Sequence, residues 1–219
     1  MGLNLSKGQM YSWVTHTWNA IKGECPHGCT YCYMKRWGKQ KPVHLDEAEL
    51  KTDLGSGNFI FVGSSCDMFA EKIPNLWLYK TLGHFTNYNN SYLFQSKNPK
   101  YLLGSSAFLP KKSVICTTIE TNRFYPDIMV NSPKPGERAK WMSYIELPKY
   151  VTIEPIIDFD LFGLIDLIRW CEPIQVNIGA DTGNNHLPEP SKEKILKLID
   201  ELKKFTIIDQ KRNLKRLLR

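Results

Sequence analysis

Six short apolar runs, each followed by a polar turn and a stretch of helical periodicity, constrain the fold of this 219-residue chain most. The runs are rich in Val, Ile, Phe and Thr and are bounded by Gly, Pro, Asn or Ser, which is typical of buried strands. We expect strands at residues 13–18, 58–62, 92–95, 114–118, 150–154 and 175–178. We expect helices at residues 45–51, 77–86, 99–108, 136–144, 159–171 and 191–205.

This alternation predicts an α/β protein in which helices cover a sheet of parallel strands. Six units are too few for a complete eight-stranded barrel, so we expect a partial (β/α)6 barrel of the TIM type. The length suits one domain over residues 1–219, with a core at residues 12–205 and a basic tail at 206–219. In such a fold the reactive groups gather at the C-terminal ends of the strands.

Composition and charge limit the class of protein, its cellular compartment and its partners. The apolar fraction of 42% is that of an ordinary globular protein, and no apolar run is long enough to span a bilayer. The N-terminus lacks a charged segment followed by an apolar one, so we expect a cytoplasmic protein with no membrane partner. The net charge of +7 is compatible with phosphate-rich partners, although a solubilising helical tail explains the basic run at the end slightly better.

Three of the six cysteines lie within eight positions, at Cys25, Cys29 and Cys32. In a reducing compartment such crowding indicates a metal site rather than a disulfide framework. The spacing is Cys-x3-Cys-x2-Cys, and Pro26 and Gly28 help the loop fold back on itself. Three thiolates on one tight loop can hold three irons of a cubane and leave the fourth iron open for a small molecule.

Two other metal sites fit this spacing less well. Structural zinc takes four ligands, usually as two pairs, and would need a distant cysteine such as Cys66 or Cys116. Ferredoxin-type clusters take a fourth cysteine, which this run does not supply. We therefore keep zinc as the alternative and predict an iron–sulfur cluster.

The segment Cys25-x3-Cys29-x-Tyr31-Cys32 resembles the signature of the radical S-adenosylmethionine (SAM) superfamily, including the aromatic residue before the last cysteine. The resemblance implies a [4Fe–4S] cluster whose open iron is chelated by SAM, with Tyr31 along the adenine. It also implies reductive cleavage of SAM to a 5′-deoxyadenosyl radical that abstracts a substrate hydrogen. An electron donor of the flavodoxin or ferredoxin type is implied as well.

Polar or glycine residues at the predicted strand ends supply candidates for the rest of the site. Lys97 could pair with the SAM carboxylate, and Glu120 could accept a hydrogen bond from a ribose or a substrate amine. Cys66 could return a hydrogen atom to a product radical, although such a cysteine is more often a small buried hydrophobe. These three are the catalytic candidates. The cofactor-binding candidates are Tyr31, Gly63, Ser64, Ser65, Ser96, Lys97, Thr118, Glu120, Glu154, Asn177 and Gly179.

A narrower resemblance covers roughly residues 12–185. Trp18-Asn19, Thr118-Ile119-Glu120, Ile153-Glu154-Pro155 and the segment around Gly179 look like the phage-associated radical SAM group related to spore photoproduct lyase. This resemblance implies a substrate that is a nucleic-acid base or a modified nucleotide. Two alternatives stay open, namely the same chemistry on a small metabolite or peptide, and a non-catalytic metal-binding nucleic-acid module.

Overall fold

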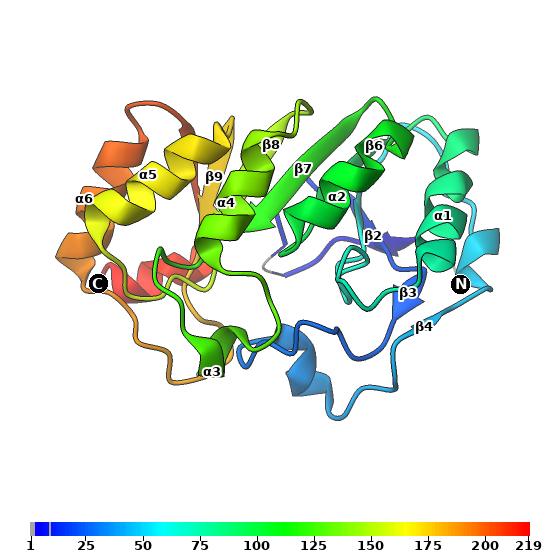
Figure 1. Cartoon of the computed structure of the whole chain (residues 1–219). Helices are drawn as coiled ribbons and strands as arrows, with labels where there is room; N and C mark the ends of the chain where they lie inside the picture. The colour runs from blue at the N-terminus through cyan, green and yellow to red at the C-terminus, as the bar shows by residue number, and fades with distance from the viewer. Residues whose placement is uncertain (1–2, 9) are drawn as a thin grey trace.

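The computed structural model describes residues 3–8 and 10–219. An eight-stranded sheet runs in the order β1-β2-β5-β6-β7-β8-β9-β10, and only the β1–β2 pairing is antiparallel (Figure 1). Its strands are β1 (Asn4–Leu5), β2 (His16–Trp18), β5 (Phe59–Val62), β6 (Ser91–Gln95), β7 (Ser113–Thr118), β8 (Lys149–Ile153), β9 (Gln175–Ile178) and β10 (Ile207–Gln210). A second, two-stranded sheet pairs β3 (Ile21–Lys22) with β4 (His44–Leu45).

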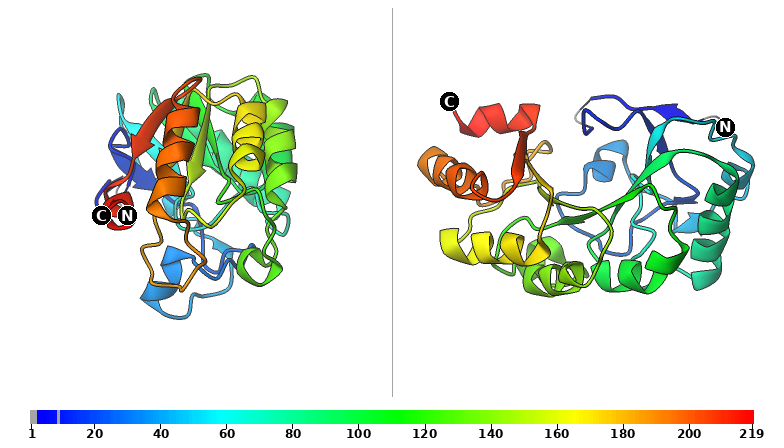
Figure 2. Two further views of the ribbon diagram at one scale, coloured as in Figure 1. Left: turned by 90° about the vertical axis from the view of Figure 1, so that its left-hand side faces the viewer. Right: turned by 90° about the horizontal axis from the view of Figure 1, so that it is seen from above.

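The helices form an outer arc around the curved main sheet (Figure 2). The α-helices are α1 (Asn75–His84), α2 (Pro99–Ser105), α3 (Pro126–Met129), α4 (Pro135–Ser143), α5 (Leu161–Cys171) and α6 (Lys192–Leu202). Short 3-10 helices are η1 (Tyr33–Trp37), η2 (Glu49–Lys51), η3 (Phe85–Asn87), η4 (Ser106–Phe108) and η5 (Arg212–Leu217). None of the helices in the described part of the chain is long and apolar enough to cross a membrane.

The architecture is the predicted α/β fold, a partial barrel of the TIM type. The parallel strands curve but do not close, because β1 and β10 are both sheet edges. The N-terminal and C-terminal segments face each other across the open side (Figure 2), where the Lys211 ammonium lies 4.6 Å from the centre of the Tyr11 ring. All six predicted strands and five of the six predicted helices are present, with ends that differ by a few residues.

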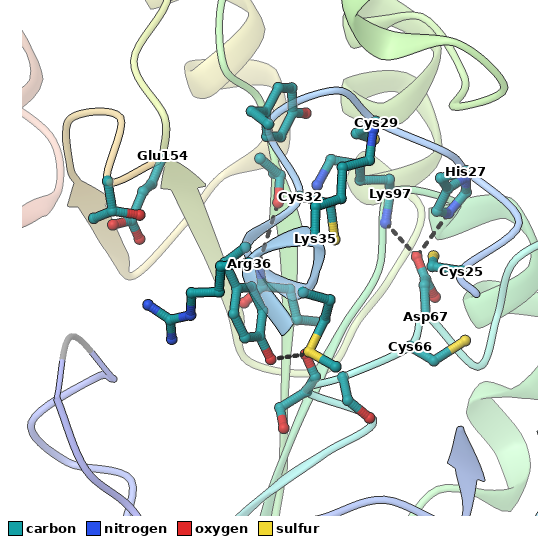
Figure 3. A pocket seen from close by; sticks show the side chains of 18 of the residues that line it. Cys25, His27, Cys29, Cys32, Lys35, Arg36, Cys66, Asp67, Lys97 and Glu154 are labelled. Atoms are coloured by element: carbon teal, nitrogen blue, oxygen red, sulfur yellow. Dashed lines mark hydrogen bonds and ion pairs between the residues drawn. The ribbon is translucent and has the colours of Figure 1, made fainter. Parts of the chain in front are cut away.

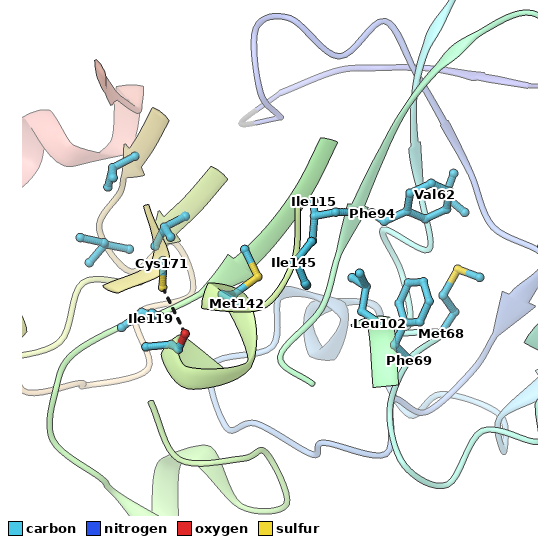
Figure 4. Packing of buried hydrophobic residues seen from close by; sticks show 14 of the residues in the cluster. Val62, Met68, Phe69, Phe94, Leu102, Ile115, Ile119, Met142, Ile145 and Cys171 are labelled. Atoms are coloured by element: carbon cyan, nitrogen blue, oxygen red, sulfur yellow. Dashed lines mark hydrogen bonds between the residues drawn. The ribbon is translucent and has the colours of Figure 1, made fainter. Parts of the chain in front are cut away.

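The main core lies between the convex face of the sheet and the helices. Strand residues Val62, Phe94 and Ile115 pack in one cluster with Leu102 of α2 and Met142 of α4 (Figure 4). Each of these side chains is at most 2% exposed. Burying a side chain of this size stabilises the fold by about 1.5–3 kcal/mol. The packing fixes the direction of each strand, and so the position of each strand end.

Two expectations near the N-terminus were wrong in detail. Residues 45–51 do not form an α-helix, since Leu45 pairs with Ile21 in the small sheet and only Glu49–Lys51 make a 3-10 turn. The Glu49 side chain accepts hydrogen bonds from Lys22 and Thr52, which anchors that turn. The strand expected at 13–18 is only His16–Trp18, because a turn closes where the Val14 amide donates to the Tyr11 carbonyl at 3.1 Å.

The basic residues near the C-terminus do not form the solubilising α-helix that their charge suggested. Ile207–Gln210 add β10 to the sheet edge in parallel register with β9, and η5 follows. Leu214 in η5 is 0% exposed and belongs to the main core. The apolar residues of this segment therefore determine its structure more than its charge does. Their packing fixes the positions of the basic residues beside them.

Candidate active site

A cavity of about 860 Å³ opens at the C-terminal ends of the strands. One side, which we call the cysteine wall, is formed by the loop at residues 25–37 and the ends of β5, β6 and β7. The opposite side, which we call the far wall, is formed by the ends of β8, β9 and β10. Figure 3 shows Glu154 on the far wall, across the cavity from Cys25 and Asp67. The predicted gathering of polar residues at strand ends thus takes place around one hollow.

Cys25, Cys29 and Cys32 all line this cavity from the loop that follows β2 and β3. Two successive turns bring them together: the Gly28 amide donates to the Cys25 carbonyl at 3.1 Å, and the Cys32 amide to the Cys29 carbonyl at 3.2 Å. Gly28 has a φ of 66°, a conformation that glycine adopts without strain. The short-range sequence therefore determines the loop geometry.

Asp67 anchors the cysteine loop to the sheet. Its Oδ2 atom accepts hydrogen bonds from His27 Nε2 at 2.8 Å, Ser96 Oγ at 2.9 Å and the Lys97 amide at 2.9 Å. Burial alone would raise the pKa of Asp67, but the hydrogen bond and charge of His27 hold that pKa below its usual value. One carboxylate thus connects the loop, the turn after β5 and the end of β6.

Cys66 lies beside the cysteine loop, although it is 34 residues from Cys32 in the sequence. Its side chain is 2% exposed, lines the cavity, and is within hydrogen-bonding reach of the Cys25 thiol. The contact with Cys66 lowers the pKa of Cys25 to about 6, while the same contact and burial raise the pKa of Cys66. Cys25 is therefore the thiol of this pair that ionises first.

A buried charge network stands behind Tyr31 and Lys97. The Tyr31 hydroxyl donates to Glu120, which also binds Arg138 Nη1 at 2.7 Å and lies 3.8 Å from Lys97 Nζ. Glu120 and Arg138 are both 0% exposed. Burial raises the pKa of Glu120, but Arg138 and Lys97 hold it below its usual value, so the carboxylate stays charged. The network fixes the Tyr31 ring with the Lys97 ammonium 5.3 Å from its centre.

The turn after β5 presents Gly63, Ser64 and Ser65 to the cavity. Gly63 has a φ of 71°, and a Cβ atom at this position would lie 3.0 Å from the Cys66 carbonyl oxygen, so the turn requires glycine. The Asn19 side-chain oxygen accepts hydrogen bonds from Ser64 Oγ at 3.2 Å and from the Ser65 amide at 2.9 Å. The turn is therefore held in place by the segment just before the cysteine loop.

The far wall is assembled by residues distant in sequence. Glu154 accepts hydrogen bonds from Lys211 Nζ at 2.5 Å and from Asn213 Nδ2 at 2.8 Å. Lys211 also contacts the ring of Tyr11, whose hydroxyl donates to Gln95 at 2.7 Å. The C-terminal segment thus contributes an ammonium group directly to the cavity.

The structure brings most of the candidate residues together. Those that line the cavity are the three loop cysteines and Tyr31, Gly63, Ser64, Ser65, Cys66, Ser96, Lys97, Thr118 and Glu154. Glu120, Asn177 and Gly179 do not line it. Asn177 is fully buried and bonds Gln175 at 2.7 Å, and Gly179 lies under the Glu154 carboxylate.

Sequence reasoning missed several residues that position the site, namely Tyr11, Asp67, Arg138 and Lys211. Asp67 follows a predicted strand end, so the rule that polar residues collect there would have found it. Arg138 and Lys211 carry no such signal, because each reaches its glutamate from a different element of the fold.

The donor set fits the group that the motif implies. Three thiols on one loop, with no fourth cysteine in the motif, match the ligand set of a cubane that leaves one iron open for a small molecule. Among residues 3–8 and 10–219, no three His, Cys, Asp or Glu side chains lie close enough together to hold a single metal ion.

Comparisons with solved structures reveal the same fold in known proteins. One structure of spore photoproduct lyase aligns with a TM-score of 0.63 at 11% identity, covering 94% of this chain and 79% of that one. Another, with bound AdoMet and dinucleoside spore photoproduct, aligns with a TM-score of 0.56 at 12% identity, covering 93% and 66%. Methylornithine synthase aligns with a TM-score of 0.54 at 14% identity, covering 88% and 63%.

No protein-family model matches the chain, and no similar sequence is found among curated proteins. At these identities the structural likeness shows the fold alone. That fold is shared by spore photoproduct lyase and methylornithine synthase.

Proposed function

We propose that this protein is a radical SAM enzyme that acts on a nucleic-acid base or a modified nucleotide. The observation that carries the proposal is the convergence of Cys25, Cys29 and Cys32 with polar strand ends on one cavity, within a radical SAM fold. The resemblance to the phage-associated group related to spore photoproduct lyase supports the substrate class. So does the structure of that lyase with AdoMet and a dinucleoside substrate.

Cys25, Cys29 and Cys32 are the residues that would hold a [4Fe–4S] cluster. When bound, the cluster supplies the electron that cleaves SAM to a 5′-deoxyadenosyl radical, and this radical abstracts a substrate hydrogen. The protein's own residues bind, orient and shield the reactants. The thiolate ligands require a reducing compartment, for which we propose the cytoplasm, and a donor of the flavodoxin or ferredoxin type.

Position in the cavity supports the cofactor-binding roles that we propose. Lys97 presents an ammonium group for the SAM carboxylate, and burial lowers its pKa less than the charges of Cys29 and Glu120 raise it, so it stays protonated. The Tyr31 ring lies on the cavity wall for contact with the adenine. The carbonyls and hydroxyls of the turn at residues 63–65 suit the SAM amino group. Glu154 on the far wall is placed for a ribose or substrate hydroxyl.

The remaining candidates have supporting roles. We assign Glu120 and Asn177 to positioning, since their side chains bond protein atoms and do not line the cavity. Ser96 lines the cavity, and we assign it to positioning because its hydroxyl donates to Asp67. Thr118 stays a candidate for contact with the cofactor, and Gly179 supports the Glu154 carboxylate from below. Cys66 lines the cavity beside Cys25, which supports its proposed role as a hydrogen-atom donor.

The test is anaerobic reconstitution with iron and sulfide, followed by reduction with dithionite in the presence of SAM. Chromatography then measures 5′-deoxyadenosine. We expect product from the wild-type chain and none from a Cys29→Ala variant. Cys171→Ala is the matched control, because Cys171 is equally buried but lies in helix α5 away from the cavity, and it should keep the product. A wild-type protein that binds zinc tightly and forms no cluster would overturn the proposal.

A small metabolite is the second candidate substrate, because methylornithine synthase, named for a small amino-acid product, shares the fold. The two substrate classes differ in their salt dependence. Binding of a nucleic acid weakens steeply as salt rises, since counterions are released from the phosphates. Binding of a small amino acid or peptide lacks that steep dependence.

A further inference from the structure

The segment that follows the cysteine motif forms a basic, aromatic rim on the cavity. We call residues 33–41 the rim segment. It carries four cations, Lys35, Arg36, Lys39 and Lys41, and no acidic residue occurs between Glu24 and Asp46. All four cations are exposed, and none takes part in an ion pair among the described residues.

Aromatic rings alternate with these cations. Trp37 is 69% exposed and Tyr33 is 41% exposed, which is unusual for side chains of this size. The Arg36 guanidinium lies 5.3 Å from the Trp37 ring centre and 5.5 Å from the Tyr33 ring centre. An exposed indole beside a guanidinium is a stacking platform for an unpaired base, because every base offers a π-face to it.

The rim segment is held in a fixed place relative to the cavity. The Tyr33 hydroxyl donates to the Ser64 carbonyl at 2.7 Å, which attaches the segment to the turn after β5. Gly38, with a φ of 79°, ends the 3-10 turn, and the Gln40 side chain donates to the Gly38 carbonyl at 3.0 Å. Figure 3 shows Arg36 directed away from the cysteines. The platform therefore stays beside the mouth of the cavity.

The positive surface continues beyond the cavity. Lys35, Arg36 and Lys39 line the mouth, whereas Trp37 and Lys41 lie outside it. Four acidic residues line the cavity. Asp67 and Glu154 are bound to His27 and Lys211, Asp181 accepts hydrogen bonds from backbone amides of its own loop, and Glu24 is exposed. A small substrate would use only the groups that face the cavity. A surface that extends past the mouth fits a polymer whose neighbouring nucleotides lie outside.

We propose that the rim segment is the docking platform for single-stranded nucleic acid. One base stacks on Trp37, and the phosphates of the adjoining nucleotides contact Lys35, Lys39 and Lys41. A single strand fits better than a duplex, because stacking requires an unpaired base and a paired base cannot enter a deep cavity without leaving its helix. This inference rests on the proposed nucleic-acid substrate and deepens it.

The experiment measures binding rather than turnover. The cluster-reconstituted full-length chain is titrated anaerobically into a fluorescein-labelled oligothymidylate of about 12 nucleotides, and anisotropy gives Kd over a range of salt concentrations. Trp37→Ala should weaken binding about 5- to 150-fold, the measured range for loss of one base–aromatic stack. The paired variant Lys35→Gln/Lys39→Gln should lower the slope of log Kd against log salt by ~1.4, since each phosphate contact contributes about 0.7.

Matched controls lie on helices α5 and α6. Trp170→Ala removes an indole that is 48% exposed, and Lys197→Gln/Lys203→Gln removes two exposed cations. Both controls should leave Kd and the salt slope unchanged. Equal losses in rim and control variants, or no binding by the wild-type chain, would overturn the proposal.

Two further outcomes are informative. If a duplex of the same sequence binds as tightly as the single strand, stacking on Trp37 is not the mode of recognition and the proposal fails. The rim variants could instead slow reduction of the cluster by an acidic flavodoxin and leave Kd for the oligonucleotide unchanged. In that case the rim is the docking site of the electron donor and the proposal fails. Failure to form 5′-deoxyadenosine would refute the proposed enzyme and would leave these binding results interpretable, so the two failures are distinguishable.

Discussion

The two walls of the cavity are built in different ways. On the cysteine wall, three candidate ligands lie within eight residues, and two local turns bring them together. Fully buried groups support them, with Glu120 and Arg138 both 0% exposed. On the far wall, Glu154 and Lys211 are separated by 57 residues, and their side chains are 19% and 10% exposed.

This difference indicates a division of labour. A wall made of local turns and a buried ion pair holds its ligands rigidly, which suits a cluster site. A wall made of partly exposed contacts between strand ends costs less to rearrange, which suits a region that must admit different ligands. Substitutions on the cysteine wall should therefore abolish cluster binding. Substitutions on the far wall should change ligand affinity and leave the cluster in place.

The largest expected effect is on iron content. Replacing Cys29 with Ala should reduce reconstituted iron to background, because the loop has no other cysteine to replace it. Glu154→Gln on the far wall should keep the wild-type iron content. Iron and sulfide assays, with the absorption spectrum of the cluster, measure both. If the far-wall variant also loses iron, the two walls do not divide their roles as we infer.

The second effect is on stability. Arg138→Met leaves the Glu120 carboxylate buried with Lys97 3.8 Å away as its nearest cation, and should lower the free energy of unfolding by about 3–5 kcal/mol. Lys211→Met on the far wall breaks a pair with a more accessible partner and should cost about 1 kcal/mol. Denaturant unfolding of the reduced apoprotein measures both values. Equal losses would show that the walls are equally rigid.

The cysteine wall was also the part that sequence could predict. Its signal is local: the spacing of Cys25, Cys29 and Cys32 and the strand-end positions of Ser64 and Lys97 need no knowledge of distant contacts. The six strands were predicted for the same reason, since each apolar run is bounded by its own turn residues. Figure 4 shows the buried side chains through which these strands pack against the helices.

The partners that side chains bind could not be predicted on either wall, because these contacts depend on long-range pairing. Lys211 was assigned to a basic helical tail, yet β10 places it against Glu154. Glu120 was expected to face a ligand, but Arg138 from helix α4 holds it in the buried layer. The prediction that Asn177 faces the cofactor failed for a related reason, since its side chain donates to the Val151 carbonyl within the sheet. A strand-end position shows that a residue is near the cavity but does not show which partner it binds.

The third effect is on ligand affinity. Glu154→Gln should weaken the binding of AdoMet to the reconstituted protein about 10- to 100-fold, because a hydrogen bond to a charged group contributes about 1.5–3 kcal/mol. Isothermal titration calorimetry measures the Kd. Glu189→Gln is the matched control, since Glu189 pairs with Arg216 at 2.5 Å and does not line this cavity. An unchanged Kd in Glu154→Gln would remove this residue from the ligand site.

The smallest expected effect is on the pH dependence of stability, through the ion pairs of Asp158 behind the far wall. Asp158, in the loop after β8, pairs with Arg123 and with Lys194 of helix α6 at 2.5 Å each. Burial raises the pKa of Asp158, but Lys194 and Arg123 hold it below its usual value. A carboxylate whose pKa is depressed on folding stabilises the protein above its unfolded pKa of about 3.9. This stabilisation is lost as the pH falls through the folded pKa.

The side chain of Asp158 is 29% exposed, so solvent screening should limit its contribution to less than about 1 kcal/mol. Asp158→Asn should therefore lower stability slightly at pH 7 and remove part of the wild-type loss of stability below about pH 4. Thermal unfolding of the apoprotein over a pH series measures the difference between the two chains. A difference that is constant down to acid pH would show that Asp158 acts through packing and hydrogen bonds. The far wall would then depend less on charge than its ion pairs indicate.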